Sequence, residues 1–113
     1  MTHHGSTVVV TRHPALVDYL REIGILPDGA RIITHASPDD VRDRHVIGIL
    51  PLHLATLALT VTEIPLAVPP EARGRELSLD EMRRWSGAPV VYVISTHDSV
   101  EAAMDYRHDA ACA

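Results

Sequence analysis

The stretch that decides the fold is TVVVTRHPALVDYLREIG, residues 7–24. Its first four residues form a short β-branched run, which is typical of a buried strand. Pro14 suits the first position of a helix, and apolar residues recur at helical spacing over 15–23. Gly24 is a natural helix end. The stretch therefore predicts a strand, a helix and a short loop between them at residues 11–13.

The same alternation continues to residue 95. Ser37-Pro38-Asp39-Asp40 predicts a helix cap and turn, and Ser78 with Glu81 predicts a capping box. Alternating strands and helices favour a mostly parallel sheet with both faces covered. We therefore expect an α/β fold, a five-stranded sheet flanked by helices, in one domain over residues 7–95 with tails at 1–6 and 96–113. The expected strands are 7–10, 30–34, 45–50, 61–68 and 89–95, and the expected helices are 15–23, 52–59 and 79–85.

The composition excludes several classes of function. A net charge of −5 and only 4% aromatic residues argue against long DNA or RNA as a partner. The one cysteine, Cys112, leaves no disulfide framework or cysteine-based zinc site within one chain. The eight histidines are scattered, so we expect no metal and no cofactor. No apolar run reaches the ~18 residues of a membrane span, and no signal peptide is recognisable, so the cytoplasm is the expected location.

The first candidate site is Thr11-Arg12-His13, where the first strand meets the first helix. Ligands of such sheets bind beyond the carboxyl ends of the strands. An anion there would meet free helix N–H groups around Pro14, the guanidinium and a hydroxyl. The imidazole of His13 could transfer a proton. The alternative is that Thr11 caps the helix and the other two side chains are merely solvated.

Two further strand ends carry polar groups. His35 and Ser37 follow the second strand, although Ser37 could simply cap a helix. Gly48 allows close backbone approach and Pro51 fixes a first helical turn, so both are candidates for substrate contact. His53 in that turn fits a surface or partly buried histidine better than a ligand.

A pair of arginines precedes the last predicted helix. Arg73 and Arg75 flank a glycine and could clamp phosphate. The alternative is surface pairing with Glu71 and Glu76, which contributes only ~0–1 kcal/mol. The sequence leaves both interpretations open.

Three segments resemble one known family. VVVTRHPA at 8–15 resembles the V-T-R-H-P-G-A signature of the CRISPR-associated Csx-sixteen family of type III systems. IGILPLHLA at 47–55 resembles its I-G-T-L-P-V-x-L-A segment, and PPEARGRELS at 69–78 resembles its P-x-E-x-R-G-x-E-L-[ST] segment. Asp80-Glu81-Met82 also matches. Order and spacing fit across nearly all of residues 7–86, with Ala15 in place of the family's glycine.

The resemblance implies a metal-independent ring nuclease on a single Rossmann-like, CARF-like domain. Such proteins cleave a cyclic oligoadenylate, here cyclic tetra-adenylate, and so switch off type III CRISPR signalling. A ring of four identical nucleotides has two-fold symmetry, so a homodimer could present one patch to it twice. In this scheme Arg12 stabilises the charged phosphorane, His13 transfers the proton, and Thr11 with backbone donors near Pro14 holds the phosphate. Further contacts would come from Arg73 and Arg75 to phosphates, and from His35 and Ser37 to base or ribose.

Two other functions compete with this one. Thr11-Arg12-His13 after a strand is also similar to the R-H-G opening of histidine phosphatases, but Pro14 replaces the glycine and no second His–Arg pairing is evident. A non-catalytic module that only binds the messenger would use the same pocket. Such a binder would not need a titratable group beside Arg12.

Overall fold

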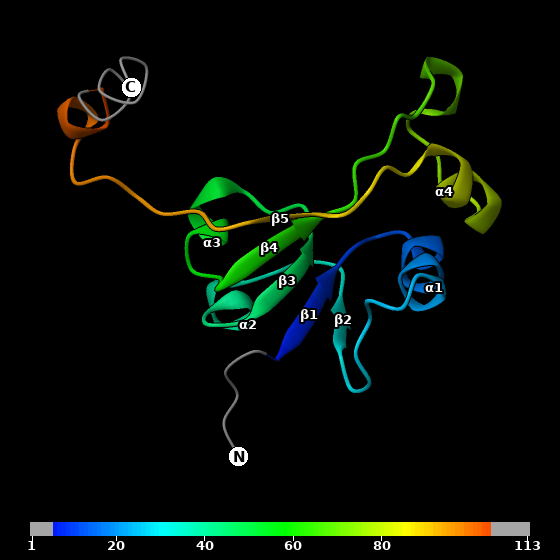
Figure 1. The fold of residues 1–113 in the computed structure, drawn as a ribbon, viewed down its shortest axis with the longest axis horizontal. Coiled ribbons are helices and arrows are strands. Elements are labelled where there is room, and N and C mark those ends of the chain that lie inside the picture. The colour runs from blue at the N-terminus through cyan, green and yellow to red at the C-terminus, as the bar shows by residue number, and fades with distance from the viewer. Residues whose placement is uncertain (1–5, 105–113) are drawn as a thin grey trace.

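The computed structural model describes residues 6–104, and these form a five-stranded sheet in the order β2-β1-β3-β4-β5. The first four strands are mutually parallel, and β5 runs antiparallel to β4 (Figure 1). The predicted α/β class and mostly parallel sheet are therefore confirmed. The strands are β1 (Thr7–Val10), β2 (Arg31–Ile33), β3 (His45–Gly48), β4 (Thr60–Glu63) and β5 (Val90–Tyr92).

Helices cover both faces of the sheet, as Figure 1 shows. Two of them pack together on one face, and the other two contact each other on the opposite face. The first pair is α1 (Pro14–Glu22) and α4 (Leu79–Trp85), and the second is α2 (Pro38–Val41) and α3 (Leu52–Ala55), with a short 3-10 helix η1 (Pro70–Ala72) before α4. This arrangement is Rossmann-like.

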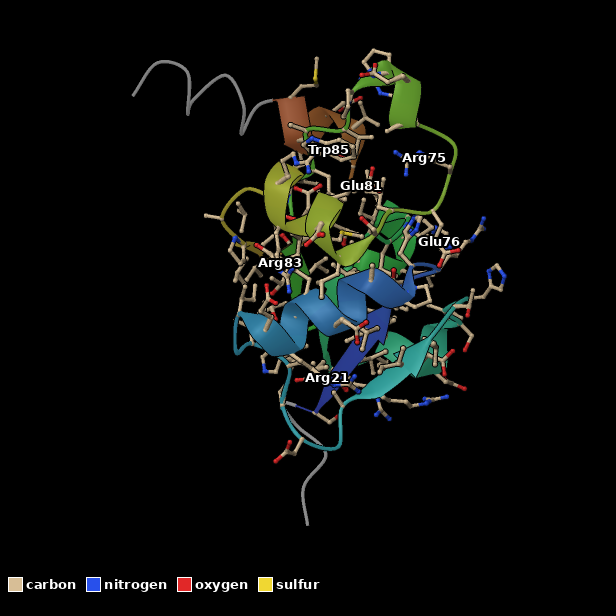
Figure 2. All side chains as sticks on the ribbon, turned by 90° about the vertical axis from the view of Figure 1, so that its right-hand side faces the viewer. Arg21, Arg75, Glu76, Glu81, Arg83 and Trp85 are labelled. Carbon is tan, nitrogen blue, oxygen red and sulfur yellow. The ribbon has the colours of Figure 1, made fainter. Side chains whose placement is uncertain are left out.

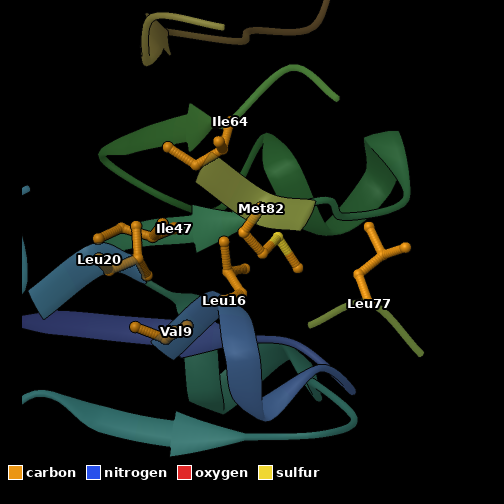
Figure 3. Close-up of a cluster of buried hydrophobic side chains, with 7 residues drawn as sticks. All are labelled: Val9, Leu16, Leu20, Ile47, Ile64, Leu77 and Met82. Atoms are coloured by element: carbon orange, nitrogen blue, oxygen red, sulfur yellow. The ribbon is translucent and has the colours of Figure 1, made fainter. Parts of the chain in front are cut away.

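The larger core lies between the sheet and the α1–α4 pair. Leu20 of α1 and Met82 of α4 are fully buried, and Figure 3 shows Met82 reaching from α4 toward Leu16 above the strands. Burial of side chains of this size stabilises the fold by about 1.5–3 kcal/mol each. The remaining members of this cluster are Val9, Ile47, Ile64 and Leu77.

Several elements end earlier than the sequence predicts. The third strand ends at Gly48, and the fourth ends at Glu63 because Pro65 has no N–H for the ladder and restricts Ile64. The helix expected over 52–59 ends at Ala55. Conversely, the turn expected at Ser37 is a short helix, α2, with Ser37 as its N-cap.

The last strand departs most from its prediction. A strand is expected over 89–95, but β5 covers only Val90–Tyr92, and all three of its residues are exposed. A helical segment follows at residues 100–104. Residues 1–5 and 105–113, which include Cys112, lie outside the described part. Among residues 6–104, every helix is too short or too polar to cross a bilayer.

Candidate functional site

The loop between β1 and α1 is held open by backbone geometry. The amide of Thr11 donates to the carbonyl of Ile33 in β2 at 2.9 Å, which continues the β1–β2 ladder into the loop. The Thr11 hydroxyl accepts a hydrogen bond from the amide of His13 at 3.0 Å. His13 is the N-cap residue of α1, in an extended conformation, and Pro14 is the first helical residue. The loop therefore turns directly into the helix start.

The amino end of α1 suits a negatively charged ligand. Its first turn contains no acidic residue, and its N-cap offers no side-chain acceptor to the free N–H groups. Such an end carries about half a positive charge. Within residues 6–104 the exposed guanidinium of Arg12 has no ion-pair partner. A ligand phosphate would meet both groups without first breaking an ion pair.

The imidazole of His13 is half-buried and incompletely paired. Its Nδ1 is buried, and no hydrogen-bond partner for it exists in the part of the chain that the structure describes. Leaving a buried polar nitrogen unpaired costs about 1–3 kcal/mol. Among the described residues, no carboxylate or carbonyl bonds Nδ1 and so fixes one tautomer of the ring.

Gly48, at the carboxyl end of β3, lies directly beside β1. It pairs with Val10 across the parallel ladder, with a φ of 137°. A Cβ at this position would stand 2.3 Å from the Val10 carbonyl oxygen. Only glycine fits there, so the close approach proposed for Gly48 is a backbone-to-backbone contact that supports the loop before Arg12.

These strand ends enclose one pocket of about 490 Å³. Thr11, Arg12 and His13 line it together, as do His35, Gly48 and Pro51. Most of the remaining wall is apolar, from α1, α3, α4 and the segments that follow β3 and β4. This wall was not predicted from the sequence, and it comprises Leu16, Ile49, Leu50, Leu54, Ile64, Leu66 and Met82.

The apolar wall could have been anticipated in part. Leu16, Leu54 and Met82 are buried residues whose spacing marks the inner face of a helix. Periodicity predicts that such residues face the core, but it does not say that the core opens at one end. Ile49, which follows Gly48 at the rim, is 77% exposed, and that exposure has no sequence signal.

Other residues predicted for the site lie outside the pocket lining. The Ser37 hydroxyl and amide both bond Asp40 at 2.9 Å, so Ser37 serves the cap of α2. These hydrogen bonds from Ser37, followed by attraction to Arg31, hold the pKa of Asp40 below its ordinary value. Pro14 shapes the start of α1 without lining the cavity, and His53 is exposed on α3.

The two arginines of the loop before α4 are engaged elsewhere. Arg75 makes a two-pronged ion pair with Glu81, at 2.8 and 2.5 Å, which lie near each other in Figure 2. Hydrogen bonds from Arg75 and then from the Ser78 amide lower the pKa of Glu81 from 4.5 to about 2. Arg73 donates to the carbonyl of Val68 at 3.3 Å. Neither arginine lines the pocket.

The described residues contain no group of three or more histidine, cysteine, aspartate or glutamate side chains placed to hold a metal ion. The polar groups at the pocket are the guanidinium of Arg12, the imidazoles of His13 and His35, the hydroxyls of Thr11 and Thr34, and the amides at the start of α1. These groups are of the types that suit an anionic ligand and proton transfer.

Fold and pocket together define a small Rossmann-like protein with an anion-receptive cavity at the carboxyl ends of its strands. The model of the family described as "Putative CRISPR-associated protein (Cas_VVA1548)" matches residues 8–99. The chain therefore belongs to this CRISPR-associated family. No curated protein and no solved structure matches it.

Proposed function

We propose that this protein is a ring nuclease of the Csx-sixteen type, which cleaves cyclic tetra-adenylate without a metal ion. The observation that carries the proposal is the convergence of Arg12 and His13 on one pocket at the open amino end of α1. Membership of a CRISPR-associated family supports this choice, because type III CRISPR systems signal through such rings. The pocket's apolar wall is suited to a nucleobase, and its rim to a phosphate.

The chemistry is an internal transesterification. A ribose 2′-oxygen attacks the adjacent phosphorus, its proton passes to a base, and the 5′-oxygen leaves with a proton from an acid. The products are linear adenylates that end in a 2′,3′-cyclic phosphate. Holding the 2′-oxygen in line with the leaving group can lower the barrier by roughly 7 kcal/mol or more. The pocket can impose that geometry on a ligand held at both base and phosphate.

Each rim residue has a distinct task in this reaction. Arg12 and the α1 amides stabilise the extra negative charge on the phosphorane. His13 takes up or delivers the proton, which its unfixed tautomer permits. Thr11 and the backbone near Pro14 hold the phosphate oxygens, and His35 contacts base or ribose. In this proposal the protein acts in the cytoplasm as a homodimer. Its net charge of −5 argues against long nucleic acid as a substrate.

The experiment is single-turnover cleavage of labelled cyclic tetra-adenylate in EDTA, with cyclic tri- and hexa-adenylate alongside. The wild type should give linear products with 2′,3′-cyclic phosphate ends, and His13→Ala should cut about 10²–10⁴-fold more slowly. His53→Ala is the matched control, because His53 is exposed and does not line the pocket. It should cut at the wild-type rate.

The outcomes separate the competing functions. An intact ring that nevertheless binds, with binding lost in Arg12→Ala, would leave a messenger-binding module. A phospho-enzyme, together with vanadate-sensitive hydrolysis of a simple phosphate monoester, would indicate a phosphatase. Equal rates for His13→Ala and His53→Ala would place the chemistry elsewhere in the chain.

A further inference from the structure

The proposed reaction needs two groups that transfer protons, and His13 supplies only one of them. The attacking 2′-oxygen must lose a proton, and the departing 5′-oxygen must gain one. In an in-line reaction these two oxygens lie on opposite sides of the phosphorus, so a single imidazole cannot reach both. A second proton-transfer group must therefore face the same phosphate from another direction.

The lining of the pocket narrows the choice of this second group to one residue. Among the described residues that line the cavity, the side chains that carry or can take up a charge are Arg12, His13 and His35. A guanidinium is never deprotonated in a protein, and the hydroxyls of Thr11 and Thr34 do not ionise near neutrality. An imidazole is the side chain whose charge ordinarily changes near neutral pH. The second imidazole of the wall belongs to His35.

His35 enters the pocket beside the loop that carries the phosphate-binding groups. Strands β1 and β2 run parallel and side by side, with Val10 opposite Ile33 (Figure 1). The amide of Thr11 donates to the Ile33 carbonyl at 2.9 Å, so the two chains are still joined where they reach the rim. Arg12 and His35 each follow two residues after the paired Val10 and Ile33, and both line the cavity.

The backbone on both sides of His35 is held in place. Ile33 is bonded to the neighbouring loop, and Ala36 packs against the buried cluster between the sheet and the α2–α3 pair. Ser37 then caps α2 through its hydroxyl and amide. The imidazole of His35 is nevertheless exposed, and it has no hydrogen-bond or ion-pair partner in the part of the chain that the structure describes. A fixed backbone with an unengaged ring suits a group that must meet a reacting atom.

We infer that His35 is the second proton-transfer residue and forms an acid–base pair with His13. One imidazole accepts the proton of the 2′-hydroxyl while the bond from that oxygen to phosphorus forms. The other imidazole donates a proton to the 5′-oxygen while the bond from phosphorus to that oxygen breaks. The two rings thus exchange protonation states with no net release of protons, and exchange with water resets them. This inference rests on the proposed function, and it makes the ribose oxygen that His35 contacts one of the reacting atoms.

Such a pair makes the cleavage rate fall on both sides of an optimum pH. One ring must be neutral and the other charged, so the rate declines in acid and in alkali, and replacement of either histidine should remove one of these limbs. The carboxylates nearest to His35 along the chain are already paired. Asp39 pairs with Arg42 at 2.6 Å. Asp40 pairs with Arg31 at 3.0 Å, and among the described residues no carboxylate lines the pocket.

The first test compares His35→Gln with the wild type in single-turnover cleavage of cyclic tetra-adenylate, in EDTA, over a range of pH. Glutamine keeps a hydrogen bond but transfers no proton. The variant should bind the ring within a few-fold of the wild type, cut it about 10²–10⁴-fold more slowly and lose one limb of the pH profile. His53→Gln is the matched control, because His53 is exposed and does not line the pocket. It should keep the wild-type rate and both limbs.

The second test uses a ring in which sulfur replaces the 5′-bridging oxygens. A thiolate leaves without a proton far more readily than an alkoxide, since the pKa of a thiol is only about 8.5. The sulfur ring should therefore restore rapid cleavage to the variant that lacks the acid and leave the variant that lacks the base slow. Comparison of His13→Gln with His35→Gln on both rings should show one rescued variant and one that is not rescued. Circular dichroism of both variants should match that of the wild type.

The outcomes separate this inference from the proposed function. If the wild type cleaves the ring and His35→Gln does so at the same rate with both limbs, His35 transfers no proton and the inference is wrong, while the proposed function stands. Rescue of both variants by sulfur, or of neither, would also overturn the acid–base pair. If the wild type leaves the ring intact, the proposed function fails and the pair fails with it.

Discussion

Two arginine-bearing segments, at residues 11–13 and 73–75, are both candidates for phosphate binding in the sequence, and the fold places their arginines in different surroundings. The first begins a helix at the carboxyl end of a central strand, and its Arg12 has no ion pair among the described residues. The second precedes a helix on the periphery, and its Arg75 is neutralised by Glu81. An arginine side chain is available to an anionic ligand only where it is not already paired with a carboxylate of the protein.

The largest expected effect is on cleavage through Arg12. Arg12→Ala should slow single-turnover cleavage of cyclic tetra-adenylate about 10²–10³-fold, the loss typical of removing one donor to a developing oxyanion. Arg75→Ala should change the rate less than about tenfold, because Arg75 is already paired with Glu81. Loss of this exposed ion pair should also change the stability of the fold little. Arg84→Ala, an exposed arginine of α4, is the control for loss of general positive charge. A deeper loss from Arg75→Ala than from Arg12→Ala would reverse the comparison.

The second effect is on folding stability. It compares Gly48, which lies beside the loop at residues 11–13, with Gly74, which lies within residues 73–75. Gly48→Ala should lower the free energy of unfolding by about 3 kcal/mol or more, because its Cβ would collide with the Val10 carbonyl. Gly74→Ala should cost only about 1–2 kcal/mol, from its φ of 83°, since nothing lies within 4 Å of its Cβ. Urea denaturation measures both. Equal losses would mean that β1 and β3 can separate at the rim.

The smallest effect is pH-dependent and belongs to the peripheral segment. The pKa of Glu81 is lowered in the folded protein, so its ionised form stabilises the fold above its unfolded-state value of 4.5. That contribution disappears as the pH falls through 4.5 toward about 2. Glu81→Gln should therefore lower the melting temperature slightly at neutral pH, and its difference from wild type should shrink in acid. A difference that is constant down to pH 2 would mean that Glu81 acts only through its cap contact with Ser78.

The sequence predicted much of the fold because its local signals agree. The β-branched run before Arg12, Pro14 at the first helical position, and the Ser78–Glu81 capping box each specify a nearby backbone state. The fifth strand was predicted correctly but too long, and its exposure was not predicted, because a run of valines is equally typical of a buried strand and of an exposed edge strand. Whether a neighbouring element lies on top of such a run depends on the path of the whole chain.

The candidate site, like the fold, was predictable from the sequence only in part. Thr11, Arg12 and His13 were found because they follow a strand, and the pocket includes all three. The pairing of Ser37 with Asp40 was foreseeable as a cap, but the pairing of Arg75 with Glu81 was not, since it depends on how the loop turns into α4.

By itself the sequence determined the order of strands and helices, the helix starts and the family, because these follow from residue type and short spacing. Tertiary structure alone decided which arginine stays free, that the strand ends enclose an apolar cavity, and that β5 lies bare at an edge. Those properties depend on distances between segments far apart in the chain, and no local pattern encodes such distances.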